Sequence, residues 1–343
     1  MKHRRMLSFL LLLVLPVLCF GADDSAKVAW TGVEKIVAIG DIHGDHDKLS
    51  QILQTTGLMD AKKRWTGGKT HLVQTGDVVD RGPESRKAMD LLIKLEKEAK
   101  KAGGIVHSLM GNHEAMNVYG DLRYVSPQEY AEFKNSESEK LRTAFFEQAV
   151  EESKAASKAS GGAVAPDRVK WDQEHPLGFF EHRLAYGPKG TYGKWIRDKN
   201  AIVQINGLLF LHGGLSLKYA VDPLPAINDR IRAELKDFAL LQNGAAMAED
   251  GPLWHRGWAE GDEATLDAEL TQVLAKYGAT RMVVGHTITP SKQVSARFQG
   301  KLLMIDVGMS SAYGGKSIGY LVCEKGACYG MDGVRRIALP ALP

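Results

Sequence analysis

Short apolar runs alternate with segments of helical periodicity through the first third of the chain. Residues 35–39, 71–75 and 105–110 are apolar enough for buried strands, and each run ends in polar and glycine positions. Between these runs, apolar side chains recur at helical spacing around residues 49–53 and 89–93. The alternation predicts a parallel β-α-β-α-β arrangement, whose polar strand ends lie at the edge where open α/β sheets place their ligands.

A second region rich in strand patterns begins at Ala201. The apolar runs 201–205 and 208–211 flank Asn206-Gly207, a pair that favours a two-residue hairpin turn. Further runs of strand character follow at residues 281–284, 302–305 and 318–323. We therefore expect a second sheet packed on the first.

Residues 121–194 separate the two strand-rich regions, which are residues 30–120 and 195–336. A capping-box pattern at residues 126–129 opens a long charged helical stretch, which Ser160-Gly161-Gly162 ends. The second half of this segment has too few large apolar residues for a domain of its own. We interpret it as a helical insertion over the sheet edge that could cover the site, within one domain formed by the two flanking regions.

The first 21 residues have the pattern of a secretory signal peptide. A basic start at residues 2–5 precedes an apolar run at residues 7–20, which is shorter than the roughly 20 residues of a membrane span. We expect cleavage after Gly21 and export to the periplasm or the medium, without stable membrane association afterwards. An uncleaved anchor is the alternative, and Pro16 and Leu18 disfavour a lipid-modified Cys19.

Composition excludes some function classes. The chain has 343 residues, of which 44% are hydrophobic, enough for one large core. Its formal net charge of +3 equals the three cations of residues 1–5, so the rest of the chain is formally neutral. A broad electrostatic surface for nucleic acid is therefore not expected. The sequence does not indicate an oligomeric state.

Two cysteines follow the predicted signal peptide, Cys323 and Cys328. They flank a predicted four-residue hairpin loop, residues 324–327, and cross-strand positions beside such a loop bring two thiols within bridging range. Export favours an oxidising compartment, so we predict a disulfide. The alternative is two free thiols packed as small apolar groups.

Five predicted strands end in polar residues of one chemical type, each beside a glycine. Carboxylate oxygen, amide oxygen and imidazole nitrogen suit divalent ions such as Mn, Fe or Zn. Each motif alone could be an ordinary turn, cap or loop, but five independent coincidences are hard to explain. The set offers enough ligands for two metal ions if one carboxylate bridges them. Its members are Asp41, His43, Asp77, Asn112, His113, His212 and His286.

The order of these motifs resembles a known family. GDIHG (40–44), GDVVDRG (76–82), GNHE (111–114), HGG (212–214) and GH (285–286) are similar to the phosphoprotein phosphatase family of binuclear metallophosphoesterases. The resemblance implies an α/β fold with a β-sandwich of two mixed sheets flanked by helices.

A finer resemblance concerns the second half of the chain. Residues 252–257 depart from the Trp-Ser-Asp-Pro pattern of eukaryotic Ser/Thr phosphatases. Together with residues 305–309, they resemble the Shewanella-like phosphatase branch.

The resemblance also implies a ligand set and a nucleophile. One metal would be held by Asp41 and His43, and Asp77 would bridge to the second. The second metal would be held by Asn112, His212 and His286. A hydroxide bridging two cations has a lowered pKa and can attack phosphorus without a protein nucleophile.

Four further residues receive catalytic roles by the same resemblance. His113 is the candidate general acid, and Asp80 would orient it and keep it protonated. Arg81 would hold the phosphoryl oxygens, with Arg256 as a second clamp. Arg256 is aligned only through its neighbours, so a surface salt-bridge partner is its alternative.

The remaining polar residues near the motifs divide into two groups. Weak candidates for substrate contact are Arg123, Tyr124 and Arg183. Glu114, Asp306 and Tyr313 could support the ligands from behind, but the absence of a role is the favoured interpretation for each. No role is expected for His46 and His255.

Three functions compete. The resemblance favours a phosphomonoesterase that acts on phosphoproteins or phosphopeptides, with a preference for phosphotyrosine. A dinucleoside-polyphosphate hydrolase or nucleotidase would use the same metals, although such nucleotides are mainly cytoplasmic. A metal-stabilised binding protein without turnover is the third possibility.

Overall fold

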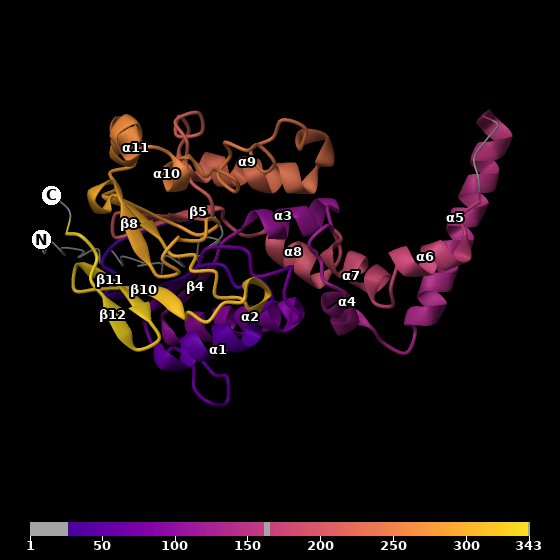
Figure 1. Cartoon of the computed structure of the whole chain (residues 1–343), viewed down its shortest axis with the longest axis horizontal. Coiled ribbons are helices and arrows are strands. Elements are labelled where there is room, and N and C mark those ends of the chain that lie inside the picture. Colours follow the sequence, from indigo (N-terminus) through magenta and orange to yellow (C-terminus); the bar gives the residue numbers. More distant parts are fainter. Residues whose placement is uncertain (1–26, 161–164, 342–343) are drawn as a thin grey trace, which may run out of the picture.

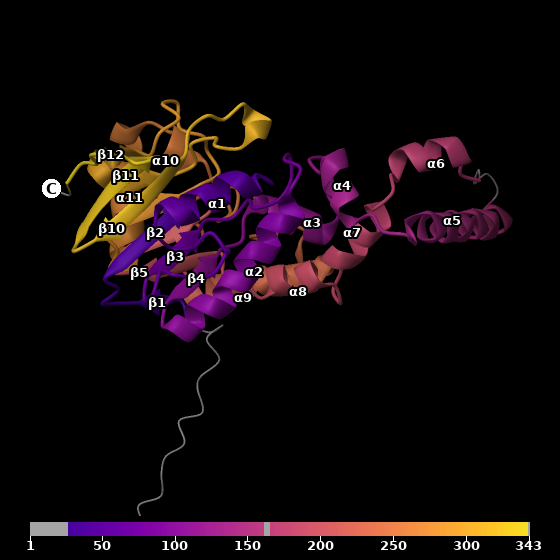
Figure 2. The ribbon, with the colours of Figure 1, turned by 90° about the horizontal axis from the view of Figure 1, so that it is seen from below.

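The computed structural model describes residues 27–160 and 165–341, so the predicted signal peptide and Gly161-Gly162 lie outside the described residues. Two six-stranded mixed sheets pack together, with helices on their outer faces (Figures 1 and 2). Buried side chains of both sheets form one continuous hydrophobic core. The predicted α/β architecture of two mixed sheets flanked by helices is confirmed.

The first sheet contains the predicted parallel unit at the start of the chain. Strands β2, β3 and β4 pair in parallel, and β10 adds antiparallel to β2. Helices α1 (His46–Thr55) and α2 (Ser85–Ala102) bury apolar faces against it. The strands, in spatial order, are β12 (Arg335–Ile337), β11 (Ala327–Asp332), β10 (Gly319–Glu324), β2 (Lys35–Ile39), β3 (His71–Gln74) and β4 (Ile105–Ser108).

The second sheet contains the predicted hairpin. Asn206 and Gly207 adopt φ values of 51° and 79°, the left-handed conformations that a tight hairpin turn requires. Strands β6 and β7 run in parallel, as do β7 and β9. The strands, in spatial order, are β1 (Ala29–Trp30), β5 (Ile202–Ile205), β6 (Leu208–Leu211), β7 (Arg281–Val284), β9 (Leu302–Met304) and β8 (Ser295–Arg297).

Helical elements after β4 complete the molecule. Helix α3 (Asn112–Tyr119) follows β4 directly, and the second sheet carries α9 (Leu224–Lys236), α10 (Gly257–Glu260) and α11 (Glu263–Lys276). Short 3₁₀ turns are η2 (Phe238–Leu240), η3 (Phe298–Gly300) and η4 (Ser311–Tyr313). Within the described ranges, no helix is long and apolar enough to cross a membrane.

The insertion differs from the single long helix that the charged pattern predicted. Helix α4 stops at Phe133 because Lys134 is extended, and Ser138 Oγ then accepts the N–H of Asn135 ahead of a new helix. Helices α5 and α6 project away from the body, whereas α4, α7 and α8 lie near α2 and α3 (Figures 1 and 2). The helices are α4 (Pro127–Phe133), α5 (Ser138–Ser160), α6 (Arg168–Glu174), α7 (Phe179–Tyr186) and α8 (Thr191–Arg197).

The predicted disulfide joins Cys323 and Cys328, which lie opposite each other on β10 and β11. The predicted four-residue loop is wrong. Glu324 pairs with Ala327, so the turn consists of Lys325-Gly326 alone, both with positive φ. A two-residue turn of this kind matches the twist of the flanking strands.

Phe210→Ala should test how far the shared core stabilises the fold. Phe210 in β6 is fully buried, so its loss leaves a cavity and should lower the free energy of unfolding by about 3–5 kcal/mol. Phe238→Ala is the matched control, because that ring is 48% exposed. Urea unfolding of both variants measures the difference, and equal losses would contradict a core centred between the sheets.

Candidate active site

The polar strand ends of both sheets converge on one buried site. Strands β2, β3 and β4 supply the residues of the first sheet, and β6 and β7 supply those of the second. His286 N–H donates to the carboxylate of Asp41 across the sheets, at 3.0 Å to Oδ1. All seven residues predicted at strand ends are buried there: Asp41, His43, Asp77, Asn112, His113, His212 and His286.

Asp77 lies at the centre of this cluster. Its Oδ2 is 3.2 Å from His212 Nε2 and 3.7 Å from His43 Nε2. His43 Nε2 is in turn 3.9 Å from Asp41 Oδ2. Asp77 therefore stands between the Asp41–His43 side and the His212 side, as a bridging carboxylate would.

The second side of the cluster gathers around His212. Its Nε2 lies 2.8 Å from Asn112 Oδ1 and 3.1 Å from His286 Nδ1. The amide nitrogen of Asn112 points instead toward Met116 Sδ, at 3.8 Å, which leaves the amide oxygen facing the cluster.

Backbone carbonyls fix the tautomers of three histidines. His43 Nδ1 donates to Val79 O at 3.1 Å, and His212 Nδ1 donates to Thr75 O at 3.0 Å. His286 is turned the other way, because its Nε2 donates to Trp254 O at 3.2 Å. In the neutral rings, the remaining nitrogens direct lone pairs into the cluster. Lone pairs and carboxylate oxygens that face one another repel unless a cation lies between them, so this donor set fits divalent metal ions.

Burial keeps the imidazoles of His43 and His286 in the neutral form that binds metal. Desolvation lowers the pKa of His43 to about 3 and strongly lowers the pKa of His286. Burial and the nearby Asp306 and Asp77 carboxylates raise the pKa of Asp41. For Asp77, burial acts upward, but His212 and His113 together hold its pKa well below the usual range.

The turns that present these side chains adopt left-handed backbone conformations. The φ values are 45° at His43, 56° at Asp77, 69° at Asp80, 66° at Arg81 and 63° at His286. Such conformations in residues with a Cβ cost about 1 kcal/mol or more each and need support from the surroundings.

Glu114 supplies part of that support. Its carboxylate accepts the N–H groups of Asp77, Val78 and Gly111, each at 2.8 Å. The prediction that Glu114 has no role is therefore wrong, because it holds the Asp77 turn against the start of α3. Its position within the GNHE motif was the only available sequence signal.

His113 differs from the other histidines in its partner. Its Nδ1 is 2.6 Å from Asp80 Oδ2, and Asn117 Nδ2 donates to Asp80 Oδ1 at 2.8 Å. Burial lowers the pKa of His113, but the attraction of Asp77 and the hydrogen bond to Asp80 outweigh burial and raise it. His113 Nε2 lies 3.8 Å from Asp77 Oδ2, so geometry alone would also allow it to bind metal.

Arg81 lies beside this pair as a cation without a carboxylate partner in the described part of the chain. Its guanidinium stacks over Tyr124 at 4.2 Å and approaches Tyr313 at 5.2 Å. Its backbone N–H donates to Tyr124 O, and its buried Nε has no hydrogen-bond partner. The start of the insertion thus reaches the site through Tyr124, whose ring is 5.0 Å from that of His113.

Tyr313 is the second residue that sequence reasoning missed. Its hydroxyl is 3.3 Å from His43 Nε2, so Tyr313 lies against a predicted metal ligand, in the supporting position that was the less favoured interpretation. It comes from η4, after the last strand of the second sheet, and no motif in the sequence marks it.

The other candidates have mixed outcomes. Arg256 donates to His286 O at 2.8 Å and Thr287 Oγ1 at 2.9 Å, and it has no ion pair within the described segments. Arg123 is exposed and pairs with Asp121, while Arg183 donates to Asn117 O at 2.6 Å. Substrate contact by these arginines stays a prediction.

Three residues expected to have no role lie beside the cluster rather than in it. Asp306 accepts the N–H of Gly308 at 2.8 Å and contributes negative charge near Asp41. His46 bonds with Lys63 at 3.1 Å, and His255 packs against Trp258.

Known proteins are similar to this chain in sequence and in fold. The calcineurin-like phosphoesterase family matches residues 34–290. The chain is 34% identical to Shewanella-like protein phosphatase 2 of Arabidopsis thaliana, over 81% of this chain and 72% of that protein. It is 30% identical to Shewanella-like protein phosphatase 1 of Plasmodium berghei (strain Anka), over 83% of this chain and 69% of that protein.

A solved structure has a similar fold. The crystal structure of a cold-active protein-tyrosine phosphatase from a psychrophilic Shewanella species aligns with a TM-score of 0.67 and 27% identity. The alignment covers 92% of this chain and 85% of that one. The family match, the relatives and the fold together show that the chain belongs to the calcineurin-like phosphoesterases, in their Shewanella-like protein phosphatase branch, and is a metal-dependent phosphatase.

Proposed function

We propose that this phosphatase hydrolyses phosphomonoesters on proteins or peptides, preferring phosphotyrosine, with two divalent metal ions of the Mn, Fe or Zn type. The observation that carries the proposal is that metal ligands and residues for acid catalysis lie together in one buried site. A cluster of metal-type donors lies beside the His113–Asp80 pair and the unpaired cation of Arg81.

Asp77 would be shared between the two metal positions. Asp41 and His43 would complete one position, since both lie within 4 Å of the side chains on that side. Asn112, His212 and His286 would complete the other, around the contacts of His212 Nε2. When bound, such ions lower the pKa of water to give a nucleophile near neutral pH and offset charge on the phosphoryl group.

His113 would donate a proton to the leaving oxygen from Nε2. Asp80 holds Nδ1 at 2.6 Å, which fixes the ring orientation and stabilises the protonated form. Asn117 holds the other oxygen of Asp80, so the carboxylate cannot rotate away from the histidine.

Arg81 would bind the phosphoryl oxygens, with Arg256, which donates to His286 O at 2.8 Å, as the second clamp. Tyr124 and Tyr313 flank the Arg81 guanidinium, so an aromatic leaving group would meet two rings next to the phosphate position. This arrangement supports a preference for phosphotyrosine. The similarity to the cold-active protein-tyrosine phosphatase also supports this preference, because that protein is named for its activity on phosphotyrosine.

We also propose that the protein is exported. The Cys323–Cys328 disulfide supports this, because disulfides persist mainly in oxidising compartments.

A substrate panel tests the substrate class directly. A phosphotyrosine peptide should be turned over faster, in kcat/KM, than its phosphoserine counterpart and far faster than diadenosine tetraphosphate. The p-nitrophenyl phosphate ester with added Mn²⁺ serves as the positive control for the metal site. Preferred hydrolysis of the dinucleotide would refute the substrate assignment while leaving the phosphatase activity intact.

Asp77→Asn should reduce the metal content from about two ions per chain to fewer than one. The loss follows because Asp77 Oδ2 faces both sides of the cluster, at 3.7 Å from His43 Nε2 and 3.2 Å from His212 Nε2. Asp229→Asn is the matched control, since that carboxylate is 72% exposed on α9. Metal analysis by plasma mass spectrometry on the same preparations gives the answer, and unchanged stoichiometry in Asp77→Asn would refute the shared-ligand arrangement.

His113→Gln should separate acid catalysis from metal binding. General acids contribute about 10²–10⁴-fold, and the loss in kcat should be larger for phenyl phosphate than for p-nitrophenyl phosphate, whose leaving group needs less help. His107→Gln is the control, because His107 is buried on β4 and its Nε2 lies 3.1 Å from Nδ1 of His71, which is not a residue of the cluster. Retained metal content with the leaving-group dependence supports the role, whereas lost metal would reassign His113 as a ligand.

A further inference from the structure

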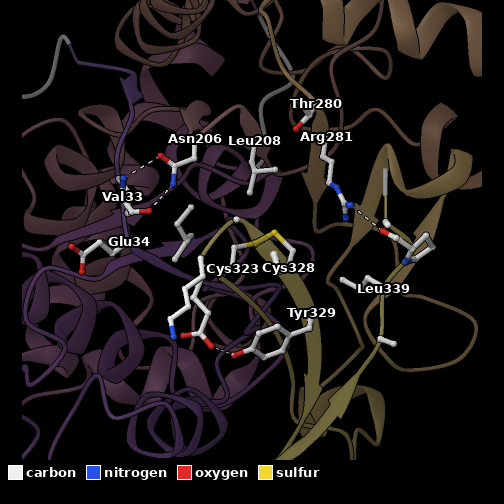
Figure 3. A pocket seen from close by; sticks show the side chains of 18 of the residues that line it. Val33, Glu34, Asn206, Leu208, Thr280, Arg281, Cys323, Cys328, Tyr329 and Leu339 are labelled. Atoms are coloured by element: carbon white, nitrogen blue, oxygen red, sulfur yellow. Dashed lines mark hydrogen bonds between the residues drawn. A yellow bond between two sulfur atoms is a disulfide. The ribbon is translucent and has the colours of Figure 1, made fainter. Parts of the chain in front are cut away.

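A cavity of about 650 Å³ opens at the end of the sheets opposite the active site. The starts of β2, β6 and β7, the β10–β11 turn and the C-terminal residues 338–341 surround it. The close-up in Figure 3 shows Arg281, the Cys323–Cys328 disulfide and Leu339 around this space. We call it the Arg281 cavity.

The Arg281 cavity is separate from the metal cluster. Three strands begin at its wall, at Ile36, Leu208 and Arg281, and each runs toward a residue of the cluster at its other end. At about 3.3 Å per residue, four or five strand residues separate the two ends by roughly 15 Å. A molecule in this cavity would therefore not touch the active site.

Arg281 is a buried cation whose guanidinium lacks one hydrogen-bond partner. Its side chain is 8% exposed, and one guanidinium nitrogen, Nη2, donates to Pro340 O at 2.9 Å. Its Nη1 has no hydrogen-bond partner, and no carboxylate lies in ion-pair range within the described residues. Burial lowers the pKa of Arg281. A buried charge without a partner is unfavourable, so the position fits an anionic group.

The rest of the wall is mainly apolar. Ile36, Leu208 and Cys323 are buried, and Leu339 closes the side formed by the C-terminal segment. Glu324 is already engaged, because its carboxylate accepts the hydroxyl of Tyr329 at 2.7 Å. Glu34 also lines the wall, but neither carboxylate forms an ion pair with Arg281 among the described residues.

We propose that the Arg281 cavity binds a small apolar molecule that carries one carboxylate or sulfonate. Its anionic end pairs with the guanidinium of Arg281, which lines the cavity and turns its enclosed, unpaired Nη1 toward the ligand, and its apolar part lies against the buried strand residues and the disulfide. The volume is within the range of about 300–1,000 Å³ that small-molecule sites occupy. The inference does not depend on which substrate the phosphatase hydrolyses.

A pair of matched fluorescent probes tests the proposal on the purified protein. The sulfonated probe 1-anilinonaphthalene-8-sulfonate should bind, and N-phenyl-1-naphthylamine, which has the same rings without the charge, should bind more weakly. Arg281→Met should weaken the sulfonate about tenfold and leave the uncharged probe unchanged. Octanoate should displace the sulfonate, whereas octanol should not.

Two further variants test whether probe binding depends on Arg281 and on this cavity. Arg64→Met removes an exposed arginine elsewhere and should change nothing. Ala338→Trp fills the cavity from its exposed rim and should abolish binding of both probes. Cooperative thermal unfolding of each variant shows that it is folded. Equal sulfonate affinity in Arg281→Met, or displacement of the probe by orthovanadate, would overturn the proposal.

A second source of the same chemistry is the carboxylate at the end of this chain. Appending a short Gly-Ser extension after Pro343 moves that carboxylate away. Equal probe binding with and without the extension supports an external ligand. Probe binding that appears only in the extended protein would overturn the proposal of an external ligand. Arg281 would then pair with the chain's own terminal carboxylate in the protein without the extension.

Discussion

Buried negative charge is the constraint on which the site depends. Asp41, Asp77, Glu114 and Asp306 are all almost fully enclosed where the two sheets meet, and Asp77 is 1% exposed. Burying a carboxylate is costly, and burial together with the neighbouring carboxylates raises the pKa of Asp41 and of Glu114. The fold tolerates this concentration because backbone N–H groups and imidazoles surround it, and because the donor set fits cations. Metal binding and folding at this edge are therefore linked. The repulsion between the buried carboxylates destabilises the metal-free site, and bound divalent ions would offset it.

The same constraint explains the unusual backbone at the strand ends. Left-handed conformations at residues such as His43, Asp77 and His286 turn side chains from different strands toward one point. Regular strands could not do this, because successive side chains alternate between faces. Glu114 and the N–H of His286 bind the turns to one another across motifs, so the strain at each turn is balanced by bonds to another.

Sequence alone could predict the parts of the site that follow local rules. Polar residues after apolar runs placed Asp41 and Asp77 correctly, because the carboxyl ends of parallel strands share an edge. The convergence of the two sheets could be expected from the motif order only, since no local pattern records it. Glu114 and Tyr313 were missed for that reason. Glu114 bonds a turn 37 residues before it, and Tyr313 reaches a histidine 270 residues before it.

The insertion shows a similar limit. Its charged pattern indicated helices but not where they would lie, and the break after Phe133 depends on a local bond between Ser138 and Asn135. A charged surface pattern contains little information about packing, because either face of such a helix can meet water.

The ends of the insertion nevertheless bear on catalysis. Arg183 on α7 donates to Asn117 O, and Asn117 holds Asp80, the partner of His113. Tyr124 accepts the backbone N–H of Arg81 and stacks on its guanidinium. The segment that projects away in Figure 1 is thus anchored through the same residues that would handle the proton and the phosphoryl group.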